Sequence, residues 1–279
     1  MKTFMLTSLA LFAFAGNSVL CRLALGENTI DAASFTIIRL LSGIVVLAII
    51  LKIGSTNDAS AGRGSWKASF YLFLYAVTFS FAYISLDTAT GALILFGSVQ
   101  AAMILVGLLT GNKLHYLEWL GVFLAFSGFV YLVLPGLTTP SLTGFILMTI
   151  AGIAWAFYTL SGKESKNPLS DTTYNFLRTL PCILILLAVA FSYVSLSPEG
   201  IFLAVLSGGI TSGIGYAIWY TALGGLSGIQ AAVVQLLVPV IAAAGGVVFS
   251  GEVISYHLVL SSMMILGGIL VVILARHRR

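Results

Sequence analysis

The amino-acid sequence predicts an all-α membrane protein with ten transmembrane helices, arranged as two inverted five-helix repeats. Three observations lead to this fold: a composition too apolar for a soluble domain, ten apolar segments of spanning length, and an ordered similarity between the two halves of the chain. Of the 279 residues, 59% are hydrophobic and 8% are charged. Ordinary soluble domains carry about 25% charged residues, so the composition excludes a soluble protein of this size.

Most of the apolar segments are close to the ~20 residues that cross ~30 Å of hydrocarbon, and the connections between them are short. The first segment follows Lys2 as a signal peptide would. No small-residue cleavage site precedes Cys21, however, so we expect this segment to be retained as a span. The predicted spans are Thr3–Leu25, Ala32–Lys52, Ser69–Leu86, Gly91–Gly111, Trp119–Pro135, Leu142–Gly162, Thr172–Ser192, Ile201–Leu223, Gly228–Phe249 and Tyr256–Leu274.

The basic residues outside the spans all fall on one side of the predicted membrane. Ten spans place both termini on the same side, and the opposite loops contain no Lys or Arg. Cytoplasmic loops are enriched in Lys and Arg, so we expect an inner-membrane protein with both termini in the cytoplasm. The basic residues on this side are Lys2, Lys52, Arg63, Lys67, Lys113, Lys163, Lys166, Arg276, Arg278 and Arg279.

Similar stretches recur in the same order in the two halves of the chain. Leu6–Ser18 in the first span resembles Leu142–Ala154 in the sixth, and Arg39 in the second span matches Arg178 in the seventh. Any single match is also explained by the frequency of Leu, Ala and Gly in apolar helices. The ordered set favours a repeat, and we divide the chain into residues 1–137 and 138–279.

Five spans per repeat is an odd number, so the second copy must enter the membrane upside down. Inverted repeats are typical of secondary transporters that work by alternating access, with the substrate site near the midplane where the halves meet. The stretch Ser207–Phe249 is the best candidate for walls of such a site, because glycines, aromatic residues and amides alternate along it. Polar groups at membrane depth need protein or water partners, since hydrocarbon supplies none.

Five stretches, in order along nearly the whole chain, carry a family resemblance. They are AFAGNSVLCRLAL, SFTIIRLLSG, SFAYISLDTATGALILF, IAGIAWAFYTLSGK and QLLVPVIAAAGGVVFSGE. With them the sequence resembles the drug/metabolite transporter superfamily, in the EamA-type ten-span group that includes the YddG amino-acid exporters. The resemblance implies export of small metabolites through a central cavity between two pseudo-symmetric four-helix bundles, with the fifth and tenth spans outside.

The first half departs from this family pattern at two places. The Gly-Glu turn expected after the ninth span is present as Gly251-Glu252, but its counterpart after the fourth span is Gly111-Asn112. The proline of the ninth span is Pro239, whereas its repeat partner in the fourth span is Val99. Bending by proline is therefore expected in the second half alone.

The sequence contains no pattern typical of an enzyme or of a metal or cofactor site. There is no HExxH motif, nucleophile elbow or P-loop, and His115, His257 and His277 lie at span ends. Cys21 and Cys182 fall in different apolar segments, so we expect neither a disulfide nor a metal site. The net charge of +4 follows from the topology and does not indicate nucleic-acid binding.

Two arginines lie well inside predicted spans, away from the span ends: Arg39 toward the outer side and Arg178 toward the inner side. A charge at the bilayer centre costs about 2.5–3.5 kcal/mol on insertion scales, so both are expected to face protein or water. We interpret them as gating or structural residues, one at each end of the pathway. The alternatives are direct contact with an anionic substrate and simple snorkelling. Arg22, near an outer end, is expected to snorkel toward Glu27.

Aromatic residues at helical spacing are the first group of candidate substrate-binding residues. Such rings stack on apolar groups and attract ammonium groups. The alternative is the aromatic belt at the membrane interface, which applies most to the residues near span ends. The aromatic candidates are Phe79, Tyr83, Trp155, Tyr158, Tyr216 and Trp219.

Amides in the middle of spans are the second group of candidates. Asn17, Gln100 and Gln235 each both donate and accept hydrogen bonds, which suits a zwitterion or a polyol. Pro239 lies one turn after Gln235 and is expected to free a carbonyl beside it. The alternative is that the amides hold neighbouring helices together, worth about 0.6 kcal/mol each on average.

The function favoured by these features is secondary active or facilitative export of a small organic metabolite, with amino acids as the preferred class. No Asp, Glu or His is available in mid-span to carry a coupling proton. We therefore expect facilitated or exchange transport, without a cofactor and with the bilayer and the substrate as partners. Glycine-lined outer faces permit a dimer without requiring one. The rival functions are export of drugs or cationic compounds, and a membrane sensor or assembly protein that transports nothing.

Overall fold

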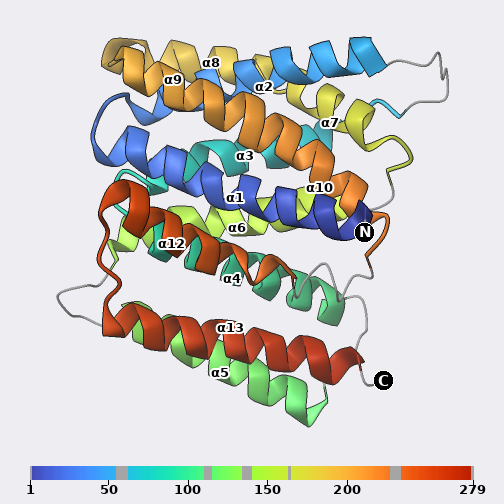
Figure 1. Ribbon diagram of the computed structural model, residues 1–279, viewed down its shortest axis with the longest axis vertical. Coiled ribbons are helices and arrows are strands. Elements are labelled where there is room, and N and C mark those ends of the chain that lie inside the picture. The colour runs from blue at the N-terminus through green and yellow to red at the C-terminus, as the bar shows by residue number, and fades with distance from the viewer. Residues whose placement is uncertain are drawn as a thin grey trace.

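The computed structural model describes residues 2–54, 62–109, 115–133, 140–162, 165–226 and 234–277. Within these ranges every regular element is a helix, and an isolated bridge between Ile30 and Leu196 joins two loops. Figure 1 shows the helices running roughly side by side, with the two chain ends at the same end of the bundle.

In the described residues, seven helical stretches are long and apolar enough to cross a membrane. Five of them are single helices: α1 (Lys2–Gly26), α2 (Ala32–Gly54), α4 (Thr88–Leu109), α6 (Leu142–Gly162) and α13 (Tyr256–His277). The sixth joins α7 (Pro168–Leu177), α8 (Leu180–Ala190) and a short 3₁₀ turn, η1 (Phe191–Tyr193). The seventh joins α9 (Pro198–Leu206), the π-helix η2 (Ser207–Ile214) and α10 (Gly215–Leu223).

The other three predicted spans are represented by shorter helices, α3 (Trp66–Ala82), α5 (Tyr116–Val133) and α12 (Val238–Ser250). Part of the ninth predicted span, residues 228–233, lies outside the described residues. The chain is thus an all-helical, multi-pass membrane protein.

Short polar residues set the starts of several helices. The side chains of Ser65, Asn167 and Ser197 each accept a hydrogen bond from the backbone N–H three residues further on, which caps α3, α7 and α9. Pro168 and Pro198 follow two of these caps, where a missing N–H leaves no hydrogen bond unmade. The starts of these helices therefore follow from local sequence.

The break between α7 and α8 has a local cause as well. Pro181 lies in the first turn of α8. A proline there cannot donate to the carbonyl four residues earlier, and its ring crowds that carbonyl. The regular α-helix is accordingly interrupted at Arg178 and Thr179, whose backbones stay in the right-handed region, and it resumes at Leu180 as α8 (Figure 1).

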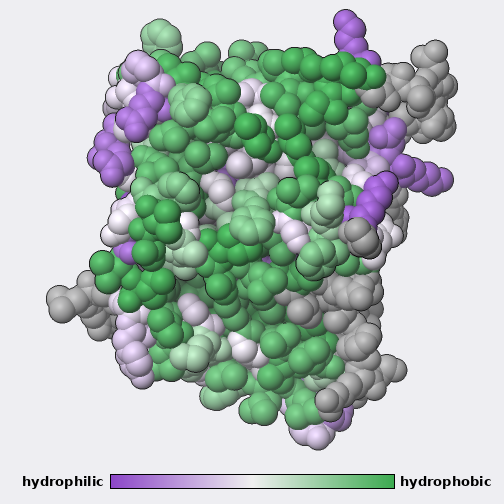
Figure 2. All heavy atoms as spheres, viewed as in Figure 1, coloured by the Kyte–Doolittle hydropathy of each residue, from purple (hydrophilic) through white to green (hydrophobic). Residues whose placement is uncertain are grey.

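The outer surface is apolar around the middle of the bundle and polar at its two ends. Figure 2 shows a broad hydrophobic face with hydrophilic side chains gathered at the two edges. Large apolar side chains in this band are well exposed, for example Val189 at 74%, Phe123 at 70% and Phe249 at 68%. Such a surface is unfavourable in water and matches the hydrocarbon of a bilayer.

A pair of helices, α5 and α13, forms one edge of the molecule (Figure 1), and glycine allows the two backbones to touch. A Cβ added at Gly121 would lie 2.5 Å from the carbonyl oxygen of Gly268, and one added at Gly268 would lie 2.6 Å from that of Gly121. Small residues at crossing points are how helices pack closely in lipid. The apolar core draws most of its buried residues from α1, α2, α3, α4 and α6, and it extends to Leu132 of α5 and Ile265 of α13.

Candidate functional site

The candidate site is organised around η2, the π-helical segment inside the stretch that joins α9 to α10. Its glycines face α2 so closely that a Cβ at Gly208 would lie 1.9 Å from the carbonyl oxygen of Arg39. Its hydroxyl residues Ser207, Thr211 and Ser212 are buried and turn inward. A π-helix adds a residue to a turn and redirects side chains, and such segments occur often at functional sites.

The three hydroxyls of η2 converge on the amide of Asn17 in α1. Oδ1 of Asn17 lies 2.7 Å from Oγ of Ser207, 3.3 Å from Oγ1 of Thr211 and 3.5 Å from Oγ of Ser212. On its other side, Nδ2 of Asn17 donates to the hydroxyl of Tyr75 in α3 at 3.2 Å. Asn17, 2% exposed, thus joins α1, α3 and η2 in one hydrogen-bonded network.

Arg39 of α2 completes this network. Its Nε donates to Oγ of Ser212 at 3.1 Å, and its Nη2 donates to the hydroxyls of Tyr75 at 3.2 Å and Tyr216 at 3.0 Å. The two tyrosine hydroxyls are themselves 3.2 Å apart. The guanidinium carbon also lies 5.0 Å from the ring centroid of Phe79, within the range of a cation–π contact. The prediction that Arg39 faces protein is confirmed.

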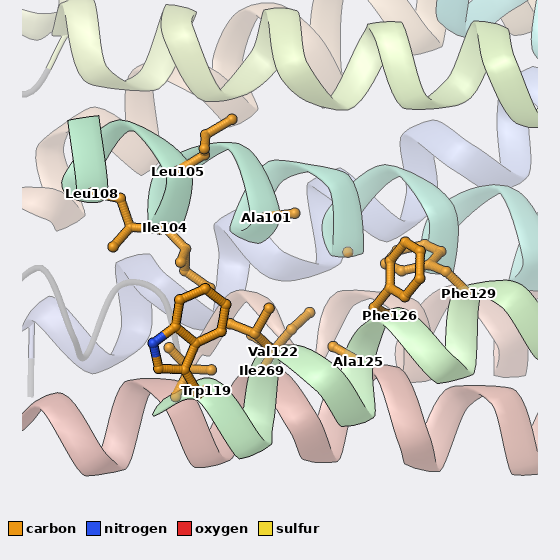
Figure 3. Close-up of a pocket in the computed structure, with 12 residues that line it drawn as sticks. Ala101, Ile104, Leu105, Leu108, Trp119, Val122, Ala125, Phe126, Phe129 and Ile269 are labelled. Atoms are coloured by element: carbon orange, nitrogen blue, oxygen red, sulfur yellow. The ribbon is translucent and has the colours of Figure 1, made fainter. Parts of the chain in front are cut away.

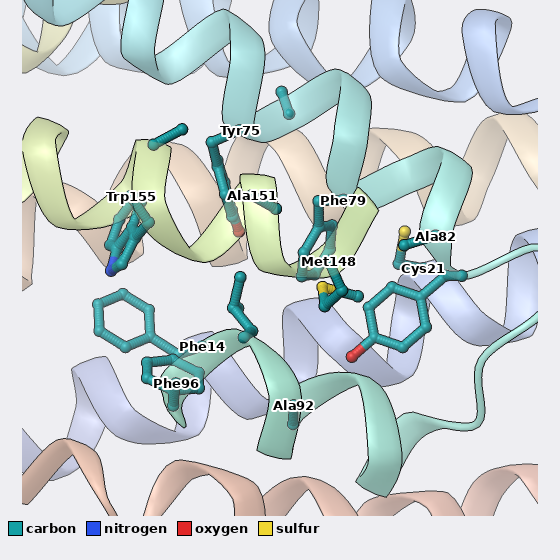
Figure 4. Packing of buried hydrophobic residues seen from close by; sticks show 14 of the residues in the cluster. Phe14, Cys21, Tyr75, Phe79, Ala82, Ala92, Phe96, Met148, Ala151 and Trp155 are labelled. Atoms are coloured by element: carbon teal, nitrogen blue, oxygen red, sulfur yellow. The ribbon is translucent and has the colours of Figure 1, made fainter. Parts of the chain in front are cut away.

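Aromatic rings lie beside Asn17 of the polar network, and Figure 4 shows four of them, Phe14, Tyr75, Phe79 and Trp155, gathered between the helices. The ring of Trp155 lies 4.6 Å from that of Tyr216 and 5.0 Å from that of Tyr75, measured between centroids. Phe14 of α1 meets Trp155 edge-on at 5.6 Å. The site therefore offers hydroxyls, an amide and a guanidinium beside a wall of rings.

The space left among these side chains is small. The cavity lined by Asn17, Tyr75, Phe79, Trp155 and Tyr216 has a volume of about 10 Å³, which is enough for about one water molecule. A metabolite needs far more room than that. Any ligand of that size can enter only if the helices on the two sides of the network move apart.

Four of the predicted site residues, Asn17, Phe79, Trp155 and Tyr216, are brought together in this centre. Three others lie buried at its flanks. Tyr83 packs edge-on against Phe79 at 4.8 Å, Tyr158 lies 5.5 Å from Trp155, and Trp219 meets Phe14 at 5.6 Å. None of the three is more than 1% exposed, so the aromatic-belt alternative is wrong for them.

The two predicted glutamines do not line the central cavity. Gln100 in α4 and Gln235 just before α12 are both buried, at 2% and 1% exposure. Pro239 lies in the first turn of α12, after a turn at residues 236–237. Residues 234–235 before this turn are helical, so the helix is interrupted within the four residues before Pro239, and the freed carbonyl beside Gln235 stays a prediction.

Arg178 has different surroundings from those of the central network. It ends α7 and is partly exposed, and its guanidinium donates to the backbone oxygen of Arg63. It also lies over the rings of Trp66 at 5.7 Å and Tyr174 at 5.9 Å. Trp66 is 65% exposed, so Arg178 belongs to the end of the bundle and not to the centre.

Four functional candidates were missed from the sequence: Tyr75, Ser207, Thr211 and Ser212. Tyr75 precedes the predicted Phe79 by one helical turn, and that spacing is the signal that points to a shared face. The other three lie in a glycine-rich run, where hydroxyls that bond to their own helix are common. Their inward direction depends on the π-helical turn, which had no recognisable sequence signal.

Polar contacts close the bundle at its two ends. At one end Glu252 accepts hydrogen bonds from N–H and Oγ1 of Thr88, at 2.7 and 2.8 Å, and Arg22 lies 3.3 Å from Asp87 and 3.6 Å from Glu252. Arg22 thus pairs with these two acids and not with Glu27 as expected.

At the other end the first turns of α7 hold the segment before α3. Asp171 accepts from N–H of Gly64 at 2.7 Å, and Asn175 accepts from N–H of Ser65 at 2.9 Å. These contacts join α7 to the start of α3. Opening of the centre on this side would require these two helices to separate.

Larger hollows lie on the lipid-facing surface. The groove of about 220 Å³ between α4, α5 and α13 in Figure 3 is lined by apolar residues such as Trp119, Phe126 and Ile269. A second, of about 490 Å³, lies between α1 and α12. Neither carries the polar groups that orient a ligand. Among the described residues, no cluster of His, Cys, Asp or Glu is suited to a metal ion.

Comparison with known proteins connects this fold to a transporter family. Residues 142–274 match the sequence model of the EamA-like transporter family. An uncharacterized protein of Pseudomonas aeruginosa is 46% identical over 275 residues, 99% of this chain and 96% of that protein. An uncharacterized transporter of Archaeoglobus fulgidus is 28% identical over 255 residues, 87% of each chain. One solved crystal structure superposes with a TM-score of 0.64 at 19% identity, covering 97% of this chain and 98% of the other; that likeness concerns the fold alone.

Proposed function

Because the chain belongs to the EamA-like transporters of the drug/metabolite transporter superfamily, we propose that it exports a small organic metabolite, with amino acids as the favoured class. Transport is secondary or facilitative and proceeds by alternating access. Nothing in the chemistry of the centre suits covalent catalysis, so we propose no enzyme activity.

One observation carries this proposal: a polar and aromatic centre is buried near the middle of an otherwise apolar bundle. Asn17, Arg39, Tyr75 and Tyr216 come from four different helices and meet there through hydrogen bonds of 3.0–3.2 Å. Polar groups are expensive at membrane depth and mark substrate pathways when they are present.

The proposed architecture is two inverted repeats, residues 1–137 and 138–279, with the centre at their seam. Two related pairs of helices pack across the seam between the halves: α4 packs on α6, and α12 packs on α1, as expected if α1 corresponds to α6 and α4 to α12. The match to the family model covers residues 142–274, within the second proposed repeat. Tyr75 from the first half and Tyr216 from the second touch across the seam.

We further propose that the protein lies in the inner membrane with both termini in the cytoplasm. Both chain ends lie at one end of the bundle (Figure 1). Lys2, Lys52 and Lys67 lie at this end, whereas Asp31, Asp87 and Glu252 lie in loops at the other. A larger share of Lys and Arg on the cytoplasmic side is the rule for membrane proteins.

Counterflow in liposomes tests the transport function. Vesicles containing the purified protein are loaded with an unlabelled amino acid such as phenylalanine or leucine, and uptake of the labelled compound is followed from outside. We expect transient accumulation that needs no ATP and no imposed proton gradient. Tyr216→Ala should abolish it, whereas Leu184→Ala on the lipid-facing surface should not. Absence of counterflow across a broad metabolite panel would favour a sensor or assembly role.

A further inference from the structure

Arg39 carries a fixed positive charge at the centre of the bundle, and none of the described acidic residues pairs with it. Its side chain is 1% exposed, and its hydrogen bonds go to the neutral hydroxyls of Ser212, Tyr75 and Tyr216. In the part of the chain that the structure describes, the ion pairs are those of Arg22 with Asp87 and Glu252. A guanidinium does not lose its proton in proteins, so the charge at the centre persists.

The same side chain has an unused donor. Nη1 of Arg39 is buried and makes no hydrogen bond within the described residues, whereas buried polar groups are nearly always bonded. An anionic oxygen atom meets both needs at once, because it supplies the missing counter-charge and accepts from Nη1. We propose that Arg39 binds the carboxylate of the substrate, and that the substrate class is monocarboxylic acids with an apolar body. This inference rests on the transport function proposed above.

The number of charges selects a monoanion. Arg39 is the one Lys or Arg among the described residues that contacts the central network, so a carboxylate leaves the loaded site neutral. A phosphate dianion would leave an excess negative charge at membrane depth, which is unfavourable. The planar fork of a guanidinium also matches the two oxygens of a carboxylate.

The surroundings determine the rest of the substrate. Phe14, Phe79 and Trp155 form an apolar wall beside the network, which suits an alkyl or aromatic body. The amide oxygen of Asn17 already accepts from the hydroxyls of η2, and no carboxylate in the described residues contacts the network. An ammonium group therefore finds no charged partner here, so the amino group of an amino acid is dispensable and a lone cation is rejected.

Opening of the site provides the space. In the closed centre the hydroxyls of Tyr75 and Tyr216 occupy Nη2 of Arg39 and lie 3.2 Å from each other. When the halves separate, the contact between the tyrosines is lost, and the carboxylate takes their place on the guanidinium. The guanidinium of Arg39 then exchanges two neutral acceptors, the tyrosine hydroxyls, for one charged acceptor, the carboxylate. Charged acceptors make stronger hydrogen bonds.

A series of matched ligands tests this without any substitution in the protein. Thermal shift and counterflow of the wild type are measured with phenylethyl, isobutyl and indolylethyl bodies, each carrying a carboxylate, a primary amide or an ammonium group. Bound ligand stabilises the folded protein according to its occupancy. We expect the acids to bind with an affinity within about threefold of that of the corresponding amino acids. The amides and amines should bind at least about tenfold more weakly than the acids, because they lack the charged group that accepts hydrogen bonds from Arg39.

Two variants locate the effect at Arg39. Asn17→Asp places a carboxylate near the guanidinium of Arg39, with the hydroxyls of Tyr75 and Ser212 bridging the two groups. This internal carboxylate should neutralise the positive charge that the substrate carboxylate would otherwise pair with. We expect a higher melting temperature without ligand and at least about tenfold weaker binding of the acids. Arg39→Met should remove the preference for acid over amide, whereas Arg178→Met, the matched control, should keep it.

The outcomes separate the two proposals. Amines or amides that bind and exchange as well as the acids would overturn the role of Arg39 and leave the transport function standing. Acid preference that survives in both Asn17→Asp and Arg39→Met would do the same. If no member of the panel binds or exchanges but another metabolite does, the role of Arg39 falls and the transport function stands; if a broad metabolite panel also shows no exchange, both proposals fall.

Discussion

Arg39 and Arg178 would correspond to each other in the proposed repeat, yet the structure gives them opposite surroundings. Arg39 is enclosed by Ser212, Tyr75 and Tyr216 in the middle of the bundle. Arg178 lies partly exposed over Trp66 at one end, where it donates to a backbone oxygen. If the proposed repeat holds, its related positions need not share a role, because the helix break at Pro181 and the glycines of η2 have no equivalents at the matching positions of the first half.

The largest expected effect comes from the backbone that holds Arg39 in place. Gly208→Val would place a Cβ atom 1.9 Å from the carbonyl oxygen of Arg39. The backbones of η2 and α2 would have to move apart to relieve this overlap. We expect a loss of about 3 kcal/mol or more, at the upper end for overpacked sites, seen as poor recovery of folded protein by size-exclusion chromatography. Gly267→Ala, with no atom within 4 Å of the new Cβ, is the matched control. Normal recovery of Gly208→Val would mean that α2 and η2 do not touch.

Exchanging each arginine for lysine sharpens the comparison itself. Lysine keeps the charge and loses the planar fork that reaches three hydroxyls. We expect Arg39→Lys to lower the initial rate of counterflow about 10-fold to 100-fold, as for hydrogen bonds that involve a charged group. Arg178→Lys should change it by no more than about twofold, because an exposed cation–π contact is weak. Equal losses for the two variants would contradict the distinction drawn between them.

The tyrosine hydroxyls test whether the network acts as a unit. Tyr75→Phe removes the acceptor shared by Asn17 and Arg39 and should destabilise the protein by about 1–3 kcal/mol. Tyr216→Phe should cost a similar amount. Because both hydroxyls share Arg39 and each other, the double variant should lose clearly less than the sum of the two. Melting temperatures provide the measurement, with exposed Tyr193→Phe as the control, and strict additivity would show two independent contacts.

The smallest effect on stability is expected from a change beside Arg178. Trp66→Leu removes the ring over which Arg178 lies at 5.7 Å and keeps an apolar side chain at this exposed site. We expect a loss of about 0.5–1 kcal/mol at most and unchanged apparent affinity for substrate in counterflow. A large change in affinity would place Arg178 in the transport pathway after all.

Much of the helical architecture could be predicted from the sequence. The sixth span was expected at Leu142–Gly162, and α6 has those bounds, because an uninterrupted apolar run between polar turns leaves few alternatives. The start of α3 was predicted three residues too late, at Ser69 instead of Trp66, since the capping role of Ser65 was overlooked. The division into α7 and α8 could have been foreseen from Pro181.

The site was harder to predict than the helices. Asn17, Trp155 and Tyr216 were identified because polar and aromatic groups in mid-span are rare. Ser207 and Ser212 were missed because their direction depends on the π-helical turn, and that turn depends on contact with α2. Gln100 and Gln235 looked equivalent to Asn17 in sequence, yet the central cavity is lined without them. Burial was predictable for all of these residues, but the choice of partner is a tertiary property.

The most direct test of the central claim is whether the buried centre is reached in turn from the two sides of the membrane. Ser207→Cys is nearly isosteric and places a thiol beside Asn17, where Oγ now lies 2.7 Å from the amide oxygen. In a background with Cys21 and Cys182 replaced by alanine, a membrane-impermeant anionic thiosulfonate is added to one side or the other, with lipid-facing Val189→Cys as the control. We predict labelling of Ser207→Cys from each side, slowed by substrate, and none of Val189→Cys. A thiol at position 207 that no reagent reaches from either side would contradict the account.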